Sequence, residues 1–213
     1  DAIYSITTNK DNDIYVCGGT TSPTFPTTQN AYQKNYLDSL KADAYVSKIN
    51  SEGTELIYSS FFGSDEYDQG YFVDIAKNKE VYLFGQTEAK GTTLMFNASY
   101  FQSDGGQFIA IFSEDLSNLK KSTIIGTGKG SPDISLTASL IDQCNRIYLS
   151  GWGSQDANLG WQLSTLNLPT TINSYQNTTD GHDFYLIVLE KDLESIIYAT
   201  YFGGSQSKEH VDG

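Results

Sequence analysis

The chain repeats a short pattern at a regular interval, and this repeat limits the folds that it can adopt. The pattern is Tyr-aliphatic-x-Gly, and its tyrosines are 67 and 66 residues apart. Its three copies run over Tyr15–Gly18, Tyr82–Gly85 and Tyr148–Gly151. So regular a period is typical of architectures that copy one supersecondary unit along the chain. We expect the recurring tyrosines Tyr15, Tyr82 and Tyr148 to pack between neighbouring units.

Each copy belongs to a longer unit, and the units span approximately 2–63, 71–126 and 134–203. In each unit, two β-rich runs split by an Asn/Asp-rich turn are followed by an irregular segment and two further β-rich runs. Such alternating runs predict antiparallel hairpins. The sequence therefore predicts an all-β segment of about three four-stranded propeller blades over 1–213. A β-solenoid is the competing fold, but solenoids build parallel stacks from shorter repeats.

Glycines recur at fixed places in these units. One set ends the second strand (Gly18, Gly85, Gly151), and another follows the fourth strand (Gly63, Gly126, Gly203). Because glycine adopts positive φ without steric cost, we expect both sets to form sharp exits from strands.

The charge balance argues against two classes of partner. With 13 Lys and Arg against 26 Asp and Glu, the formal net charge is −13, which disfavours contact with phosphate backbones and predicts no nucleic-acid binding. No apolar run is long enough to span a bilayer, and no signal peptide is visible, so we expect no membrane insertion and place any targeting segment outside these residues. Cys17 and Cys144 lie in units separated by a whole blade, which predicts two free thiols.

The first and third units share three longer segments. They are Pro-Thr-Thr followed by Tyr-Gln (26–33 and 169–176), Asp-x-Tyr (43–45 and 183–185) and Ile-Tyr-x-x-aromatic-Phe-Gly (57–63 and 197–203). These segments resemble the bacterial seven-bladed β-propeller (SBBP-type) repeat family over essentially the whole chain. The middle unit has no proline at this place, and Gln107 stands where the others have Asp. We therefore expect its outer loop to run differently.

The resemblance implies a secreted or surface-exposed module of a large bacterial protein. The closing residues 209–213 are similar to those of very large surface proteins of gliding bacteria, which carry adhesive modules and use a dedicated (type IX) secretion system. Three blades do not close a ring, and residues 210–213 stand where the first strand of a further blade would start. We therefore expect a fragment of a larger propeller, with assembly of several copies into one ring as the alternative.

Three side chains are candidates for ligand binding. Trp152 and Trp161 flank an irregular segment that only the third unit contains, and His182 lies in a loop that enters a strand. Binding residues favour such loops on a rigid scaffold, and tryptophan rings stack on sugars. The competing interpretation is that the tryptophans pack or anchor the loop and that His182 hydrogen-bonds a turn.

Metal and catalytic signals are weak. His182 and His210 are the only histidines, and they lack zinc-site spacing. The acidic loops 11–13 and 65–68 offer oxygen ligands for calcium, but neither matches a known calcium loop, which favours solvated turn carboxylates. The run Gly126–Ser131 matches no phosphate-binding motif and is interpreted as a connection between blades. We predict no catalytic residues, no metal site and no cofactor.

Together these features predict a non-catalytic scaffold or interaction module of a secreted bacterial cell-surface protein, of the adhesion or gliding-associated type. Its expected partners are other domains of the parent chain or other surface proteins. A carbohydrate-binding propeller is the alternative, and a polysaccharide-degrading enzyme comes third, because no convergent cluster of carboxylates or histidines is visible in the motifs.

Overall fold

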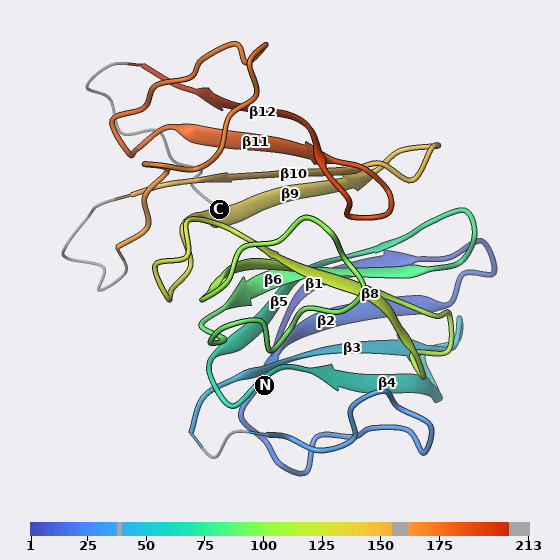
Figure 1. The fold of residues 1–213 in the computed structure, drawn as a ribbon. Coiled ribbons are helices and arrows are strands. Elements are labelled where there is room, and N and C mark those ends of the chain that lie inside the picture. Colours follow the sequence, from blue (N-terminus) through green and yellow to red (C-terminus); the bar gives the residue numbers. More distant parts are fainter. Residues whose placement is uncertain (38–39, 155–161, 205–213) are drawn as a thin grey trace.

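The computed structural model describes residues 1–37, 40–154 and 162–204, and in these residues the chain is all-β (Figure 1). Its strands form three four-stranded antiparallel sheets, each made of four consecutive strands in meander order. The first sheet contains β1 (Ala2–Thr8), β2 (Ile14–Thr20), β3 (Asp43–Ile49) and β4 (Leu56–Phe62). The second contains β5 (Asp68–Ile75), β6 (Val81–Thr87), β7 (Gly106–Phe112) and β8 (Leu119–Ile125). The third contains β9 (Ser135–Ile141), β10 (Ile147–Trp152), β11 (Phe184–Leu189) and β12 (Ile196–Phe202).

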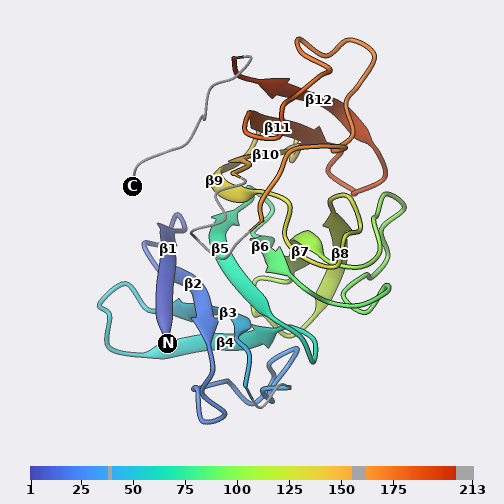
Figure 2. The same ribbon diagram turned by 90° about the vertical axis from the view of Figure 1, so that its left-hand side faces the viewer.

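The three sheets spread like a fan. Figure 2 shows the first strands β1, β5 and β9 near one another and the fourth strands β4, β8 and β12 at the rim. The strand contacts agree, because β5 packs against β1 and also against β9. We call the face of a sheet that is directed toward the next sheet along the chain its following face, and the opposite face its preceding face.

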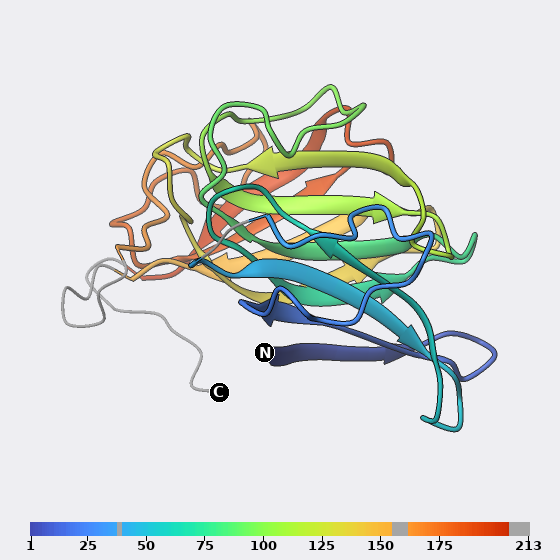
Figure 3. The ribbon, with the colours of Figure 1, turned by 90° about the horizontal axis from the view of Figure 1, so that it is seen from below.

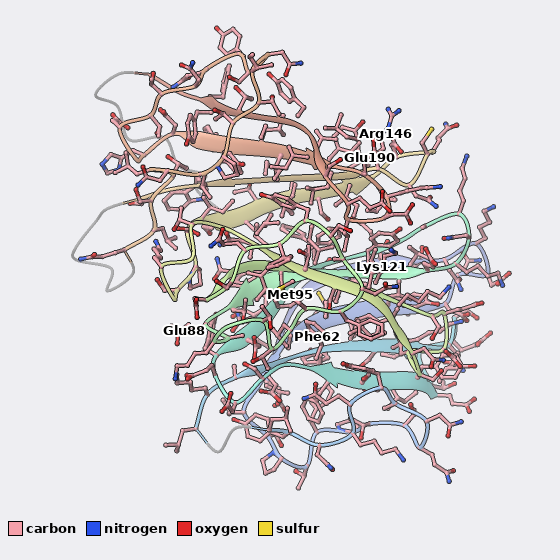
Figure 4. All side chains as sticks on the ribbon, viewed as in Figure 1. Phe62, Glu88, Met95, Lys121, Arg146 and Glu190 are labelled. Carbon is pink, nitrogen blue, oxygen red and sulfur yellow. The ribbon has the colours of Figure 1, made fainter. Side chains whose placement is uncertain are left out.

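The connections divide the molecule into two ends. Short hairpin turns lie at one end, which we call the turn end, and the longer connections 21–42, 88–105 and 153–183 leave and re-enter their sheets at the other, which we call the loop end (Figure 3). In Figure 4, Glu88 marks the loop end, whereas Arg146 and Glu190 mark the turn end. Over the described residues, no helix is long and apolar enough to cross a membrane.

Apolar side chains fill both junctions between sheets. At the first junction, Phe62 of β4 meets Phe108 and Phe112 of β7, with ring centroids 5.0 and 5.7 Å apart. At the second, Tyr82 and Ile109 share a core with residues of the third sheet that include Tyr185 and Tyr201. Burial of this surface is the main stabilising contribution to the stack.

The recurring tyrosines do not all share one environment. Tyr15 and Tyr82 are buried between successive sheets, as the repeat predicts. Tyr148 is only half-buried, and its packing between units stays a prediction. Its strand register places it on the following face of the third sheet, which no further described sheet covers.

The glycines of the second strands serve a purpose that the sequence did not indicate. Gly18, Gly85 and Gly151 lie within β2, β6 and β10 and do not have positive φ, so the prediction of strand exits is wrong. In each sheet the neighbouring first strand contains a β-bulge or other irregularity. There a carbonyl oxygen of Ala2, Gln69 or Ser135 occupies the space that a Cβ would need. Glycine is therefore required for close backbone approach. Among the second set, Gly126 alone has positive φ.

Each long loop follows the fourth strand of its own sheet. The backbone N–H of Thr28, Phe96 or Thr171 donates to the carbonyl of Ser59, Ser122 or Ala199, at 3.0 to 3.1 Å. The stretch of the first loop that contains Phe25 and Tyr36 also packs on part of the preceding face of the first sheet, where the ring centroids of Phe25 and Tyr45 are 4.2 Å apart. The loops are thus part of the sheets that they connect.

The outer loops of the first and third sheets are held by the same polar latch. The Gln33 amide nitrogen donates to Asp43, and the Gln33 amide oxygen accepts from the Gly63 N–H. Gln176, Asp183 and Gly203 repeat these bonds in the third sheet. The latch explains why Tyr-Gln and Asp recur in those two units.

The middle sheet lacks this latch. Counting back from the second hairpin of each sheet, Gly106 occupies the position of Asp43 and Asp183, so the assignment of Gln107 to that position is wrong. Gln107 lies one residue further on and donates to the Ile134 carbonyl at the second junction. The Gln102 N–H donates to the Ile124 carbonyl, whereas in the other sheets the loop glutamine carbonyl accepts from the strand. The outer loop of the middle unit does run differently.

Both cysteines are free, as predicted. Cys17 is buried in β2, and burial raises the pKa of its thiol. Cys144 is exposed in the turn between β9 and β10.

Candidate functional site

A polar pocket of about 590 Å³ opens at the loop end, where the second and third sheets meet. Two connections line it: the segment between β8 and β9, and the part of the third-unit loop that precedes β11. Its lining residues are Thr127, Lys129, Ser131, Asp133, Gln162, Ser164, Leu166 and Asn167.

Asp133 organises the first wall of this pocket. It is buried, and its carboxylate accepts hydrogen bonds from the Thr127 N–H at 2.8 Å and the Thr127 hydroxyl at 2.7 Å. The Lys129 ammonium lies 3.5 Å from the same carboxylate. These bonds fix the Gly-rich connection that begins at Gly126, so that run is a structural turn between sheets, as its sequence indicates.

Two bonds connect this wall to the third-unit loop. The Ser164 N–H donates to the Asp133 carbonyl at 2.7 Å, and the Lys129 ammonium donates to the Gln162 carbonyl at 2.9 Å. Ser131, Ser164 and Asn167, whose side chains carry hydroxyl and amide groups, are also among the lining residues. Such a set of neutral donors and acceptors suits a polyhydroxylated ligand better than an apolar one.

Neither of the described residues that we predicted to bind a ligand, Trp152 and His182, lines this pocket. Trp152 ends β10 and stands opposite Phe184 in the register, on the following face of the third sheet. His182 is half-buried in the loop before β11, and its backbone N–H donates to the Asp180 carboxylate at 3.1 Å. Trp161 lies outside the described residues, as do residues 210–213, for which we predicted the start of a further blade.

Sequence reasoning missed the residues that line the pocket. The signal for Asp133 was weak, because a single carboxylate after a glycine-rich run has many equivalents among 26 acidic residues. The pocket forms where residues 127–133 meet residues 162–167, and no local sequence pattern indicates that these two segments come together. The run Gly126–Ser131 predicts a connection between blades, not a pocket wall.

The acidic loops that could supply calcium ligands are engaged with other partners. Asp68 is buried and accepts from the N–H and hydroxyl of Ser64, at 2.6 and 2.8 Å. Glu66 pairs with Lys41 and Lys90, which hold the pKa of its carboxyl at about 2. Asp13 pairs with the buried Lys48 at 3.0 Å. Over the described part of the chain, no group of three or more His, Cys, Asp or Glu is placed to hold a metal ion. Calcium binding there stays an untested alternative.

A similar packing of charge marks the turn end. The Lys48 ammonium lies 5.4 and 5.7 Å from the ring centroids of Tyr15 and Tyr58, and it is 3.5 Å from Glu114. Side chains from the β1–β2 turn, β2, β4 and the β7–β8 turn thus surround this cation of β3. This cluster ties the first sheet to the second and is structural.

Comparisons with known proteins give no relative from which a role for this pocket could be inferred. No protein-family model matches the chain, and no curated protein is significantly similar to it.

Proposed function

We propose that the three sheets are blades of a β-propeller segment that acts as a non-catalytic scaffold or interaction module of a secreted bacterial cell-surface protein, of the adhesion or gliding-associated type. The fan of sheets, with first strands inside and fourth strands at the rim, supports the propeller. The resemblance of the repeated segments to the SBBP-type family supports the location. The proposed partners are other domains of the parent chain or other surface proteins.

One observation carries the scaffold role: the recurring polar residues hold the framework together. Gln33 and Asp43 perform the same bonds as Gln176 and Asp183, 140 or more residues later. Asp68 and Asp133 likewise accept hydrogen bonds from the residues that leave β4 and β8. The latch recurs in the first and third sheets, and the carboxylate bonds recur in both connections between sheets; both support a rigid framework at the loop end.

Incubation of the purified chain with a panel of bacterial and plant polysaccharides tests this role. We expect no release of reducing ends. Release that a carboxylate substitution at the loop end abolishes would contradict the proposal and favour the polysaccharide-degrading alternative.

The polar pocket favours glycan binding as a second candidate function. A volume of about 590 Å³ and a lining of hydroxyl, amide and ammonium groups suit one or two sugar units. In a glycan array followed by calorimetry, Asn167→Ala should weaken any binding at this pocket at least tenfold, because it removes a side chain that can both donate and accept. Lys120→Ala is the matched control, since Lys120 pairs with Glu80, away from the pocket. Equal loss in both variants, or a ligand indifferent to Asn167→Ala, would exclude the pocket.

A further inference from the structure

The first two long loops each contact the next sheet along the chain through a backbone hydrogen bond. The Tyr32 N–H, in the loop of the first sheet, donates to the Leu116 carbonyl in the β7–β8 turn at 2.9 Å. The Tyr100 N–H, in the loop of the second sheet, donates to the Leu193 carbonyl in the β11–β12 turn, also at 2.9 Å. We call this repeated contact between a loop tyrosine and a turn leucine the clasp.

The turn leucines are held in a conformation that disfavours them. Leu116 and Leu193 have φ of 53° and 55°, in the left-handed region where a β-carbon is normally penalised. Both side chains are fully buried, Leu116 in the core of the first junction and Leu193 in that of the second. A buried side chain offsets the backbone strain, so the leucine identity serves the contact with the preceding sheet.

The first sheet has no such leucine. Gly53 occupies the equivalent position in the β3–β4 turn, with φ of 71°, and it is exposed. A Cβ at Gly53 would find no atom within 4 Å. The first sheet therefore offers a turn of the same shape without the side chain that the clasp encloses.

The third sheet has the loop tyrosine of a clasp but no described turn leucine to meet it. Tyr175 stands at the position of Tyr32 and Tyr100 and is 77% exposed, and its N–H donates instead to the Tyr198 hydroxyl at 3.1 Å. On the following face beside it, Phe202 and Leu186 are exposed, although Phe62 and Val46 at the same positions of the first sheet are buried. The third sheet thus carries a clasp loop and an apolar face, and no described turn leucine meets them.

We propose that the following face of the third sheet binds a further four-stranded sheet of the same repeat, recognised by a leucine at the fourth position of the turn between its third and fourth strands. The inference rests on the proposed blade scaffold and names its partner. A second unmodified copy of this chain is the weaker occupant, because its free turn presents Gly53.

The chain itself, with one substitution, is the probe. Gly53→Leu adds the leucine to the free turn, where the space is open and φ is close to that of the two natural leucines. We expect Gly53→Leu to strengthen head-to-tail self-association at least tenfold over the unmodified chain in sedimentation equilibrium, since one buried leucine is worth about that factor. Gly53→Asn is the matched control, because asparagine tolerates positive φ but supplies no apolar side chain.

Three outcomes would overturn the proposal. They are a folded Gly53→Leu chain that sediments like the unmodified one, an equal effect of Gly53→Asn, and association of Gly53→Leu that survives Phe202→Asp on the docking face. Tight association of the unmodified chain, abolished by Phe202→Asp, would show that the second copy binds without a leucine and would also overturn it. Circular dichroism establishes folding in each variant. None of these results depends on the polysaccharide assay, so the scaffold role and the docking rule can fail separately.

Discussion

The first and third sheets carry the same apolar positions on their following faces, but among the described residues another sheet covers only the first of these faces. Phe62 is 1% exposed against the second sheet, whereas Phe202, at the same place in β12, is 61% exposed. Val46 and Leu186 differ in the same way. The repeat therefore specifies an apolar face in every sheet, and what packs on that face decides whether the residues contribute to stability.

The largest expected effect is a difference in stability between alanine variants of Phe62 and Phe202. Phe62→Ala should lower the free energy of unfolding by about 3–5 kcal/mol, because it leaves a cavity among Phe108 and Phe112. Phe202→Ala should cost less than about 1 kcal/mol, because its ring is largely in water already. Urea unfolding of both variants measures the difference in their free energies of unfolding. Phe62 is labelled in Figure 4. Similar costs would show that the following face of the third sheet is covered in solution.

A smaller effect should appear as a pH dependence at the covered junction. Burial raises the pKa of Asp68 to about 6, and burial is the largest of its causes. Since the folded pKa lies above the unfolded value, the folded state holds this proton more tightly, so the contribution is fully present below pH about 4 and is lost as pH rises to about 6.

Asp68→Asn should remove this contribution, because the amide can still accept from Ser64 but does not ionise. The difference in unfolding free energy between Asp68→Asn and the unmodified chain should therefore change by about 2–3 kcal/mol between pH 4 and pH 7, in favour of the variant at pH 7. A constant difference across that range would contradict the raised pKa.

The smallest effect should come from the rim of the same junction. Glu66 pairs with Lys41 and Lys90, and these lysines lower the pKa of its carboxyl to about 2. Its contribution should be present above pH about 4.5 and lost as pH falls toward 2. Glu66→Gln should lower the melting temperature by about 1–2 °C at low salt and by less at about 1 M salt. Glu52→Gln, in the exposed turn 50–55, is the control and should cause no salt-dependent shift.

The sequence predicted the hairpins and their number because strand alternation and polar turns are local signals. The second strand of the first unit illustrates this: branched and aromatic residues precede Gly18, and the turn at Asn12 lies directly before the strand. The role of Gly18 itself was not predictable, since it depends on a carbonyl of β1 brought close by an irregularity in the pairing. A one-residue shift likewise placed Gln107 wrongly, because the middle loop has a different length.

The candidate site was less predictable than the fold. Trp152 and His182 were chosen for their chemistry and do lie at the loop end, but the pocket is lined by Lys129, Asp133 and Ser164. These residues come together only when the connection after β8 meets the loop before β11. Contact between two loops across a sheet junction produces no repeating sequence pattern in either loop, so it could not be predicted.

The run of each long loop along the fourth strand of its own sheet has a consequence for how such repeats can be rearranged. An uncovered edge strand is a template on which another chain can add a strand and begin to aggregate. Here the Thr28, Phe96 and Thr171 amides already occupy acceptors of β4, β8 and β12. Each unit therefore brings its own protection against edge-to-edge aggregation. Duplication, deletion or exchange of whole units can therefore change the number of sheets without exposing an unpaired edge strand at the rim.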